Sequence, residues 1–138
     1  EKIDKLKIRD RIIMCGLVDL TDVPKYLAAS DILVSPCIPN EKGEFINSPV
    51  KIFEYLAMGK PLVASDIGQQ KEIIKDRENG LLFKTFDENE FVEKIIELKN
   101  NKELQTKLSI NARQDAITNY DWKNNRDIIL NVYQKYAK

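Results

Sequence analysis

The sequence predicts an α/β fold in which a parallel sheet carries helices on both faces and is followed by a helical tail. Short apolar runs alternate with helical segments from residue 12 to residue 83, the pattern typical of a parallel sheet covered by helices. The run at 61–65 is bounded by turn residues, as expected of a strand buried on both faces. After residue 83, three helical segments follow one another with no strand between them.

Each element follows from a local signal. The apolar runs at 12–16 and 32–35 predict the first two strands, and Asp22 predicts the start of a helix at 23–29 between them. The following segments predict a helix at 49–58, a strand at 61–65, a helix at 69–75, a turn at 78–80, a strand at 81–83 and helices at 87–98, 102–116 and 122–136. The only long irregular stretch lies at 36–47, and loops of that length are often binding loops.

The composition limits the class of protein. A chain of 138 residues suits one domain that buries roughly two-thirds of its unfolded surface, so we expect residues 1–138 to form a single domain. The 22 basic residues equal the 22 acidic ones in number and are scattered over helices, which indicates no nucleic-acid partner. No apolar stretch approaches the roughly 20 residues that span a bilayer, and we expect a cytoplasmic protein with at most peripheral contact at the inner face of the membrane.

The sequence contains no histidine, which excludes histidine-based acid–base catalysis, serine–histidine triads and the commonest transition-metal ligand. The two cysteines, Cys15 and Cys37, each end an apolar run and lack the paired spacing of a zinc or redox site. We therefore expect both to be reduced residues of the core, and we expect no metal site.

The segment 48–65 carries most of the functional information. Ser48 is a suitable N-cap and Pro49 suits the first helical position, so we expect a helix to begin there. Gly59 supplies its stop. The helical spacing predicts an apolar stripe with one carboxylate, Glu54, among its members, which are Val50, Phe53, Ala57 and Met58. A carboxylate on that face needs a partner.

The amino end of this helix suits a phosphate-bearing ligand. In open parallel sheets, ligands bind beyond the carboxyl ends of the strands, and the free N–H groups of a helix N-terminus favour phosphate. Lys51 is well placed for an anion above that end, and Glu54 can accept two hydrogen bonds from the vicinal hydroxyls of a ribose. The alternative interpretation is a solvated pair three residues apart, which stabilises a helix by about 0.2–0.5 kcal/mol.

Four segments resemble, in the correct order, the group 1 (family 4) glycosyltransferases of the GT-B fold. Residues 48–65 (SPVKIFEYLAMGKPLVAS) resemble the nucleotide-sugar signature of the C-terminal domain in that family. Residues 13–18 resemble its strand and glycine turn, residues 26–36 its "yl-ASDI-LVSP" stretch, and residues 68–83 its "G-x3-EII-x4-NGLLF" stretch. The resemblance covers nearly the whole chain and implies the Rossmann-like C-terminal half of a GT-B fold.

The resemblance implies a domain that binds a UDP- or GDP-sugar donor. In the family, the glutamate matched by Glu54 holds the ribose hydroxyls, and backbone N–H groups around the helix start meet the diphosphate and sugar. The donor-site residues implied here are Ser48, Pro49, Val50, Lys51, Glu54 and Gly16. The implied reaction is a retaining transfer of the sugar to a hydroxyl acceptor in polysaccharide biosynthesis, with no essential metal and no cofactor besides the donor. No residue of this chain is a credible sole catalytic base.

Two departures from the family pattern limit these implications. Many members have a second glutamate eight positions before the one matched by Glu54, where this chain has Ile46. Glu41 or Glu44 would replace it, unless both are merely solvated loop residues. The diphosphate-binding arginine and lysine of the family follow a strand that precedes the helix at 3–7, where this chain begins. We therefore expect a fragment, inactive alone, that lacks the first strand and the N-terminal acceptor-binding domain.

Two other functions stay open. A nucleotide-sugar epimerase or a phosphorylase would share the two-domain architecture, and a non-catalytic module would keep the fold for protein interaction, which the missing first glutamate supports. The last helix carries an apolar stripe that predicts packing, with part of it exposed toward the absent domain; its members are Trp122, Ile129, Val132, Tyr133 and Tyr136.

Overall fold

The computed structural model describes residues 2–41, 45 and 49–137. Its elements, in chain order, are α1 (Lys2–Lys5), the 3-10 helix η1 (Arg9–Arg11), α2 (Val23–Ala29), β1 (Leu33–Ser35), α3 (Val50–Ala57), β2 (Leu62–Ser65), α4 (Gly68–Ile73), β3 (Leu81–Phe83), α5 (Glu88–Asn100), α6 (Lys102–Asn119) and α7 (Trp122–Tyr136). From residue 23 onward, every predicted helix and strand is present close to its predicted bounds, and the α/β class is confirmed.

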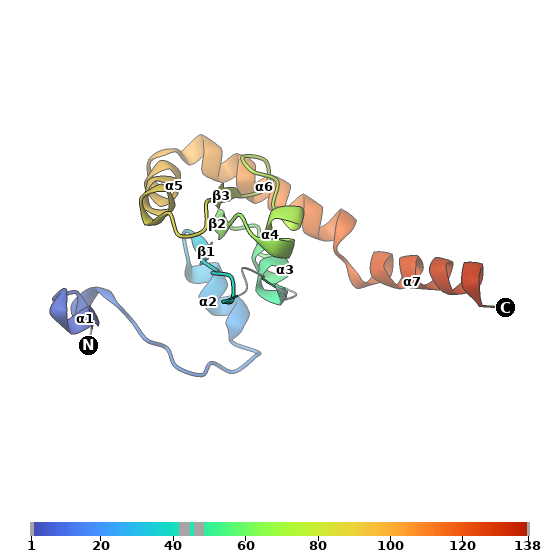
Figure 1. The fold of residues 1–138 in the computed structure, drawn as a ribbon, viewed down its shortest axis with the longest axis horizontal. Coiled ribbons are helices and arrows are strands. Elements are labelled where there is room, and N and C mark those ends of the chain that lie inside the picture. The colour runs from blue at the N-terminus through green and yellow to red at the C-terminus, as the bar shows by residue number, and fades with distance from the viewer. Residues whose placement is uncertain (1, 42–44, 46–48, 138) are drawn as a thin grey trace.

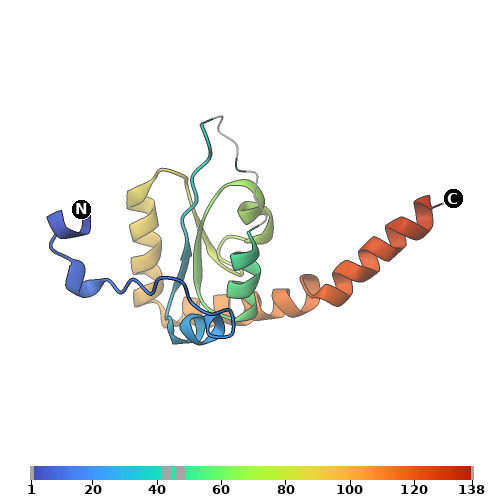
Figure 2. The same ribbon diagram turned by 90° about the horizontal axis from the view of Figure 1, so that it is seen from below.

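The three strands form one parallel sheet in the order β1-β2-β3 (Figure 1). The register places Val34 of β1 beside Val63 of β2, and Ala64 of β2 beside Leu82 of β3. Parallel neighbours need a crossover connection, usually a helix, and α3 and α4 provide the two crossovers. Figure 2 shows α3 and α4 on one side of the sheet and α5 on the other. The expected helices on both faces are therefore present.

Two clusters of buried side chains hold these helices on the sheet. Leu62 and Ala64 of β2 face the first cluster, whereas Val63 faces the second, because side chains alternate along a strand. The first cluster also contains Ile52, Leu56, Ile73, Ile74 and Ala112. The second also contains Leu81, Phe83, Leu98, Leu104 and Leu108. All four residues of β2 are buried, which confirms the prediction of a strand covered on both faces.

Local signals in the sequence explain where the helices begin and end. Asp87, Asn101 and Asp121 are the N-caps of α5, α6 and α7, and each side chain accepts a hydrogen bond from the backbone N–H three residues on. After α3, Gly59 adopts a φ of +60°, as predicted for a glycine stop. The Arg113 guanidinium of α6 donates a hydrogen bond to the last carbonyl of α3, which ties these two helices together.

The prediction of a strand at 12–16 is wrong. The segment 12–20 is irregular and runs outside the sheet (Figures 1 and 2), with Ile13 88% and Leu17 104% exposed. A strand is stabilised by hydrogen bonds to a neighbouring strand. Within the described ranges, no strand pairs with this segment. The segment has the apolar composition of a strand, but no neighbouring strand in the described structure pairs with its backbone.

The prediction that both cysteines are core residues is also wrong. Cys15 lies in the exposed segment 12–20, and Cys37 is half-buried just beyond the end of β1. Both are free thiols. Burial of Cys15 was expected from its apolar neighbours, and those neighbours are themselves exposed because the predicted strand does not form.

The helix α7 extends away from the body of the molecule (Figures 1 and 2). The packing predicted for its apolar stripe does not occur within this chain, since Trp122 is 86% and Tyr133 68% exposed. The other three members, Ile129, Val132 and Tyr136, are exposed as well. Neither α7 nor any other helix in the described part of the chain is both long and apolar enough to cross a membrane.

Candidate functional site

The candidate site lies at the carboxyl edge of the sheet, where α3 begins. The chain leaves β1 at Ser35, and α3 starts at Val50 on that same edge (Figure 2). Pro49 is the N-cap of α3, so the helix begins one residue later than predicted. Pro49 is buried, whereas Val50 and Lys51 of the first turn are exposed. The predicted cap at Ser48 lies outside the described residues.

The structure corrects which face of α3 is apolar. Its buried residues are Ile52 and Leu56, which lie four positions apart and therefore on one side of the helix. Val50, predicted to be part of the buried stripe, is 63% exposed. Glu54 lies one turn from Val50 and is exposed as well, so its carboxylate faces solvent and not packed apolar side chains. The side chain is thus accessible to a ligand.

The first turn of α3 has two backbone N–H groups without a backbone partner among the described residues. The backbone N–H groups of Val50 and Lys51 donate to no backbone carbonyl of the described residues, as is usual at a helix start. These N–H groups and the helix dipole together favour an anion. Lys51 adds a cationic side chain to the same turn. The amino end of α3 is therefore chemically suited to a phosphate group.

Lys51 and Glu54 do not form an ion pair with each other. Neither side chain has a hydrogen bond or an ion pair within the part of the chain that the structure describes. The alternative interpretation of a solvated Lys51–Glu54 pair is therefore right that both side chains are exposed, but the two do not pair with each other. An exposed carboxylate without a partner retains its capacity to accept two hydrogen bonds from a ligand.

Polar groups that were not predicted from the sequence lie where β1 and β2 end. The Cys37 N–H donates a 2.8 Å hydrogen bond to Ser65 Oγ, and Ser35 Oγ lies 3.8 Å from Cys37 Sγ. Ser35 and Ser65 are fully buried. Burial raises the pKa of the neighbouring Tyr55 hydroxyl, with smaller contributions from the negative charges of Glu54 and Cys37. The signal in the sequence was a serine as the last residue of the predicted strands at 32–35 and 61–65.

Gly16, the sixth predicted donor-site residue, lies on the irregular segment 12–20. It has a φ of +65°, and a Cβ added there would meet no atom within 4 Å. The structure thus places Pro49, Val50, Lys51 and Glu54 in the first two turns of α3 and at its N-cap. Gly16 makes no contact with them. Its place in the donor site stays a prediction.

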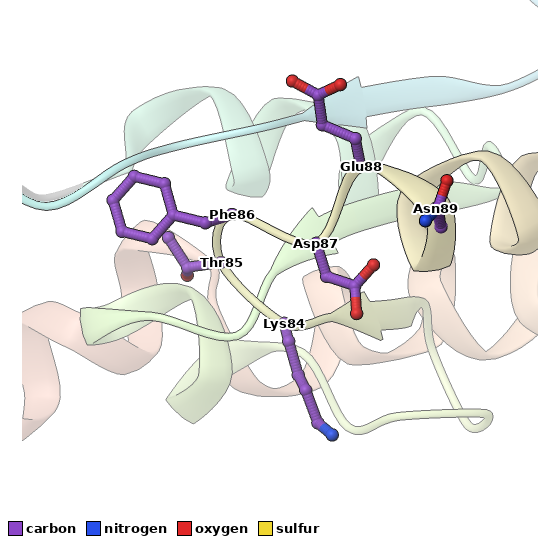
Figure 3. Close-up of a pocket in the computed structure, with 6 residues that line it drawn as sticks. All are labelled: Lys84, Thr85, Phe86, Asp87, Glu88 and Asn89. Atoms are coloured by element: carbon purple, nitrogen blue, oxygen red, sulfur yellow. The ribbon is translucent and has the colours of Figure 1, made fainter.

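Two hollows lie at the same edge of the sheet, on the side of β3 and α5. The smaller, of about 240 Å³, is lined mainly by aromatic and aliphatic side chains together with Cys37 and Ser65. The larger, of about 500 Å³, is lined by residues 84–89, and Figure 3 shows Lys84 and Glu88 pointing to opposite sides of that loop. The Asp87 carboxylate is occupied as the N-cap of α5, since Oδ1 accepts the Glu90 N–H at 2.9 Å. The charged groups of this loop therefore do not converge on a common point.

A metal centre would need several ligating side chains near one another. Among the described residues, no group of three histidine, cysteine, aspartate or glutamate side chains is arranged to hold a metal ion. The polar chemistry at this edge of the sheet therefore comes from backbone N–H groups, hydroxyls, Lys51 and Glu54.

Comparison with known proteins places this geometry in context. Residues 1–115 match the profile of the family described as "Glycosyl transferases group 1". The N,N'-diacetylbacillosaminyl-diphospho-undecaprenol alpha-1,3-N-acetylgalactosaminyltransferase of Campylobacter jejuni is 33% identical over 118 residues, which are 86% of this chain and 30% of that protein. Spore coat protein SA of Bacillus subtilis is 25% identical over 128 residues, 92% of this chain and 33% of that protein.

Solved structures share the fold. The crystal structure of Alr3699/HepE from Anabaena in complex with UDP-glucose matches with a TM-score of 0.80 at 24% identity, over 96% of this chain and 35% of that chain. The chain spans about a third of the length of the curated relatives it matches.

Proposed function

This chain belongs to the group 1 glycosyl transferases, and on that premise we propose that it is the domain that binds the nucleotide-sugar donor. The observation that carries the proposal is the start of α3, where open backbone N–H groups, Lys51 and an unpaired Glu54 lie within two turns at the carboxyl edge of a parallel sheet. A relative of the same fold has been crystallised with UDP-glucose, which supports a donor of this class.

We assign the parts of the donor to α3 by their charge. The diphosphate lies over the N–H groups of Val50 and Lys51, where the helix dipole and the Lys51 ammonium favour negative charge. The ribose lies one turn further along, where the Glu54 carboxylate accepts hydrogen bonds from both of its hydroxyls. Ser48 belongs to the proposed donor site by its place before Pro49 in the sequence, and Gly16, which makes no contact with α3, stays a prediction from the family resemblance.

The proposed reaction is transfer of the sugar, with retention of its anomeric configuration, to a hydroxyl acceptor. The helix N-terminus and Lys51 would stabilise the charge that develops on the departing diphosphate, so that no metal is required for this role. The described residues offer no sole catalytic base, and the chain spans only about a third of its relatives. We therefore infer that the acceptor-binding part lies in another domain, that this chain alone is inactive, and that polysaccharide biosynthesis in the cytoplasm is the context.

Calorimetric titration tests the proposal. The chain is titrated with UDP, GDP, ADP and their sugar conjugates, and we expect one nucleotide class to bind selectively. Because a hydrogen bond to a charged group contributes about 1.5–3 kcal/mol, Glu54→Ala should weaken binding about 10- to 100-fold without unfolding the domain. Glu93→Ala, at an exposed glutamate of α5, is the matched control and should leave binding unchanged.

Two results would redirect the assignment. Wild-type affinity in a folded Glu54→Ala variant would contradict the ribose role of Glu54. Absence of binding to every nucleotide would leave two explanations, the lack of the family's diphosphate-binding arginine and lysine or a non-catalytic interaction module, and the same titration on an intact protein that contains this domain decides between them. Detection of sugar transfer by an intact protein that contains this domain separates a glycosyltransferase from an epimerase of the same architecture.

A further inference from the structure

The amide of Gln70, on α4, is buried without a hydrogen-bond partner. Gln70 is 0% exposed, and neither its amide nitrogen nor its amide oxygen has a partner among the described residues. The other fully buried polar side chain of comparable size, Asn79, is paired with the Lys75 N–H, the Ile73 carbonyl and the Asp115 carboxylate. Buried polar groups in native proteins are nearly always paired, so the unpaired amide of Gln70 calls for an explanation.

Gln70 lies in the first turn of α4, near the edge of the sheet at which α3 begins. Ile73 and Ile74, one turn further along α4, pack in the same cluster as Ile52 in the first turn of α3. Gln70 therefore lies one turn nearer the carboxyl edge of the sheet, at the end of that cluster where α3 begins. A Cβ added at Gly68 would lie 2.8 Å from Phe45, which places the start of α4 against the chain that leads into α3. Both figures show α3 and α4 as neighbours (Figures 1 and 2).

We propose that Gln70 is a donor-binding residue, whose amide gains its hydrogen bonds when the sugar-diphosphate part of a nucleotide sugar occupies the amino end of α3. The inference rests on the proposed function and adds a residue to that site. A neutral amide both donates and accepts hydrogen bonds, which matches the hydroxyl groups of a sugar and the oxygens of a phosphate. A leucine or methionine would fill the same volume with no unpaired atoms, so the cost of the glutamine in the free state needs an offset in the bound state.

The proposal places Gln70 nearer the phosphates than the ribose. Glu54, assigned to the ribose, lies one turn beyond the first turn of α3, whereas Gln70 lies in the first turn of α4, which begins at the same carboxyl edge of the sheet as α3. Replacement of Gln70 should therefore affect a nucleotide sugar and leave a nucleoside monophosphate nearly unaffected. This difference between two ligands is a readout that a purely structural role would not produce.

The test combines thermal unfolding with calorimetry on Gln70→Leu and Gln70→Met. We expect both variants to melt at a temperature equal to or above that of the wild type, because two unpaired buried atoms are removed. We expect UDP-glucose or GDP-mannose, whichever the wild type binds more tightly, to bind about tenfold more weakly, and the matching nucleoside monophosphate to bind equally well. Gln69→Leu, at the exposed neighbouring glutamine, is the matched control and should not change the affinity for either ligand.

The outcomes separate this inference from the proposed function. Unchanged nucleotide-sugar affinity in folded Gln70→Leu, with affinity lost in Glu54→Ala, overturns the role of Gln70 and leaves the donor site in place. Equal weakening of the nucleotide sugar and the monophosphate also overturns it, because the effect would then not concern the sugar-diphosphate part. If neither the wild-type chain nor an intact protein that contains this domain binds any of these probes, both the role of Gln70 and the proposed function are overturned.

Discussion

Two apolar runs of this chain, residues 12–16 and residues 61–65, both predict strands and have opposite fates. The second is β2, which pairs with β1 and β3 and is buried at every position. The first forms no strand, and its Ile13 is 88% exposed. The difference lies in the surroundings, because β2 has a hydrogen-bonded neighbour on each side and packed helices on each face. Apolar composition thus favours a strand only where partners for its backbone are present.

The largest effect expected from this comparison is on stability. Leu62→Ala removes a side chain that is 0% exposed in the middle of the sheet and should lower the free energy of unfolding by about 2–5 kcal/mol. Leu17→Ala makes the same chemical change at a side chain that is 104% exposed, and we expect a change within about 0.5 kcal/mol. Urea unfolding of both variants measures the difference. A comparable loss in Leu17→Ala would mean that the segment 12–20 is packed in solution.

The same contrast explains how much of the fold could be predicted. The bounds of α2, β3 and α7 agree with the prediction residue for residue, because start signals and apolar periodicity are local properties of the sequence. The strand at 12–16 and the burial of Cys15 were wrong, because each depends on a partner strand that no local pattern reveals. The packing predicted for α7 failed for the same reason, since periodicity defines an apolar face but not what covers it.

The candidate site was predictable in part. The chemistry of Lys51 and Glu54 at a helix start followed from the sequence, and the structure places both side chains in solvent on α3. The predicted buried face of that helix was wrong, because α3 has apolar residues on more than one side and only the packing shows that Ile52 and Leu56, and not Val50, face the core. Gln70 gave no signal, because a glutamine in a short polar helix looks solvated until its neighbours are known.

A second, smaller effect concerns two glycines that both have positive φ. A Cβ at Gly59 would lie 3.3 Å from both Arg113 Cβ and the Ser109 carbonyl oxygen, whereas a Cβ at Gly16 would meet nothing within 4 Å. Gly59→Ala combines left-handed strain with this crowding and should cost about 1–2 kcal/mol. Gly16→Ala should cost less than about 0.5 kcal/mol, because an unpacked segment can adopt another φ. Thermal unfolding measures both, and equal losses would contradict the comparison.

The smallest expected effect is on how the free energy of unfolding depends on pH, and it comes from Tyr55 in α3. Burial, with Glu54 and then Cys37, raises the pKa of the folded Tyr55 hydroxyl above its ordinary value of 10.0. Above about pH 10 the unfolded chain therefore binds fewer protons than the folded one at this residue, and the free energy of unfolding falls as the pH rises toward the folded pKa. Tyr55→Phe should flatten the alkaline part of a stability–pH profile, with Tyr133→Phe on exposed α7 as the matched removal of one hydroxyl. An alkaline slope that is unchanged in Tyr55→Phe would show that burial of Tyr55 does not contribute to it, and the remaining slope would point to Tyr120, whose pKa burial and Asp115 also raise.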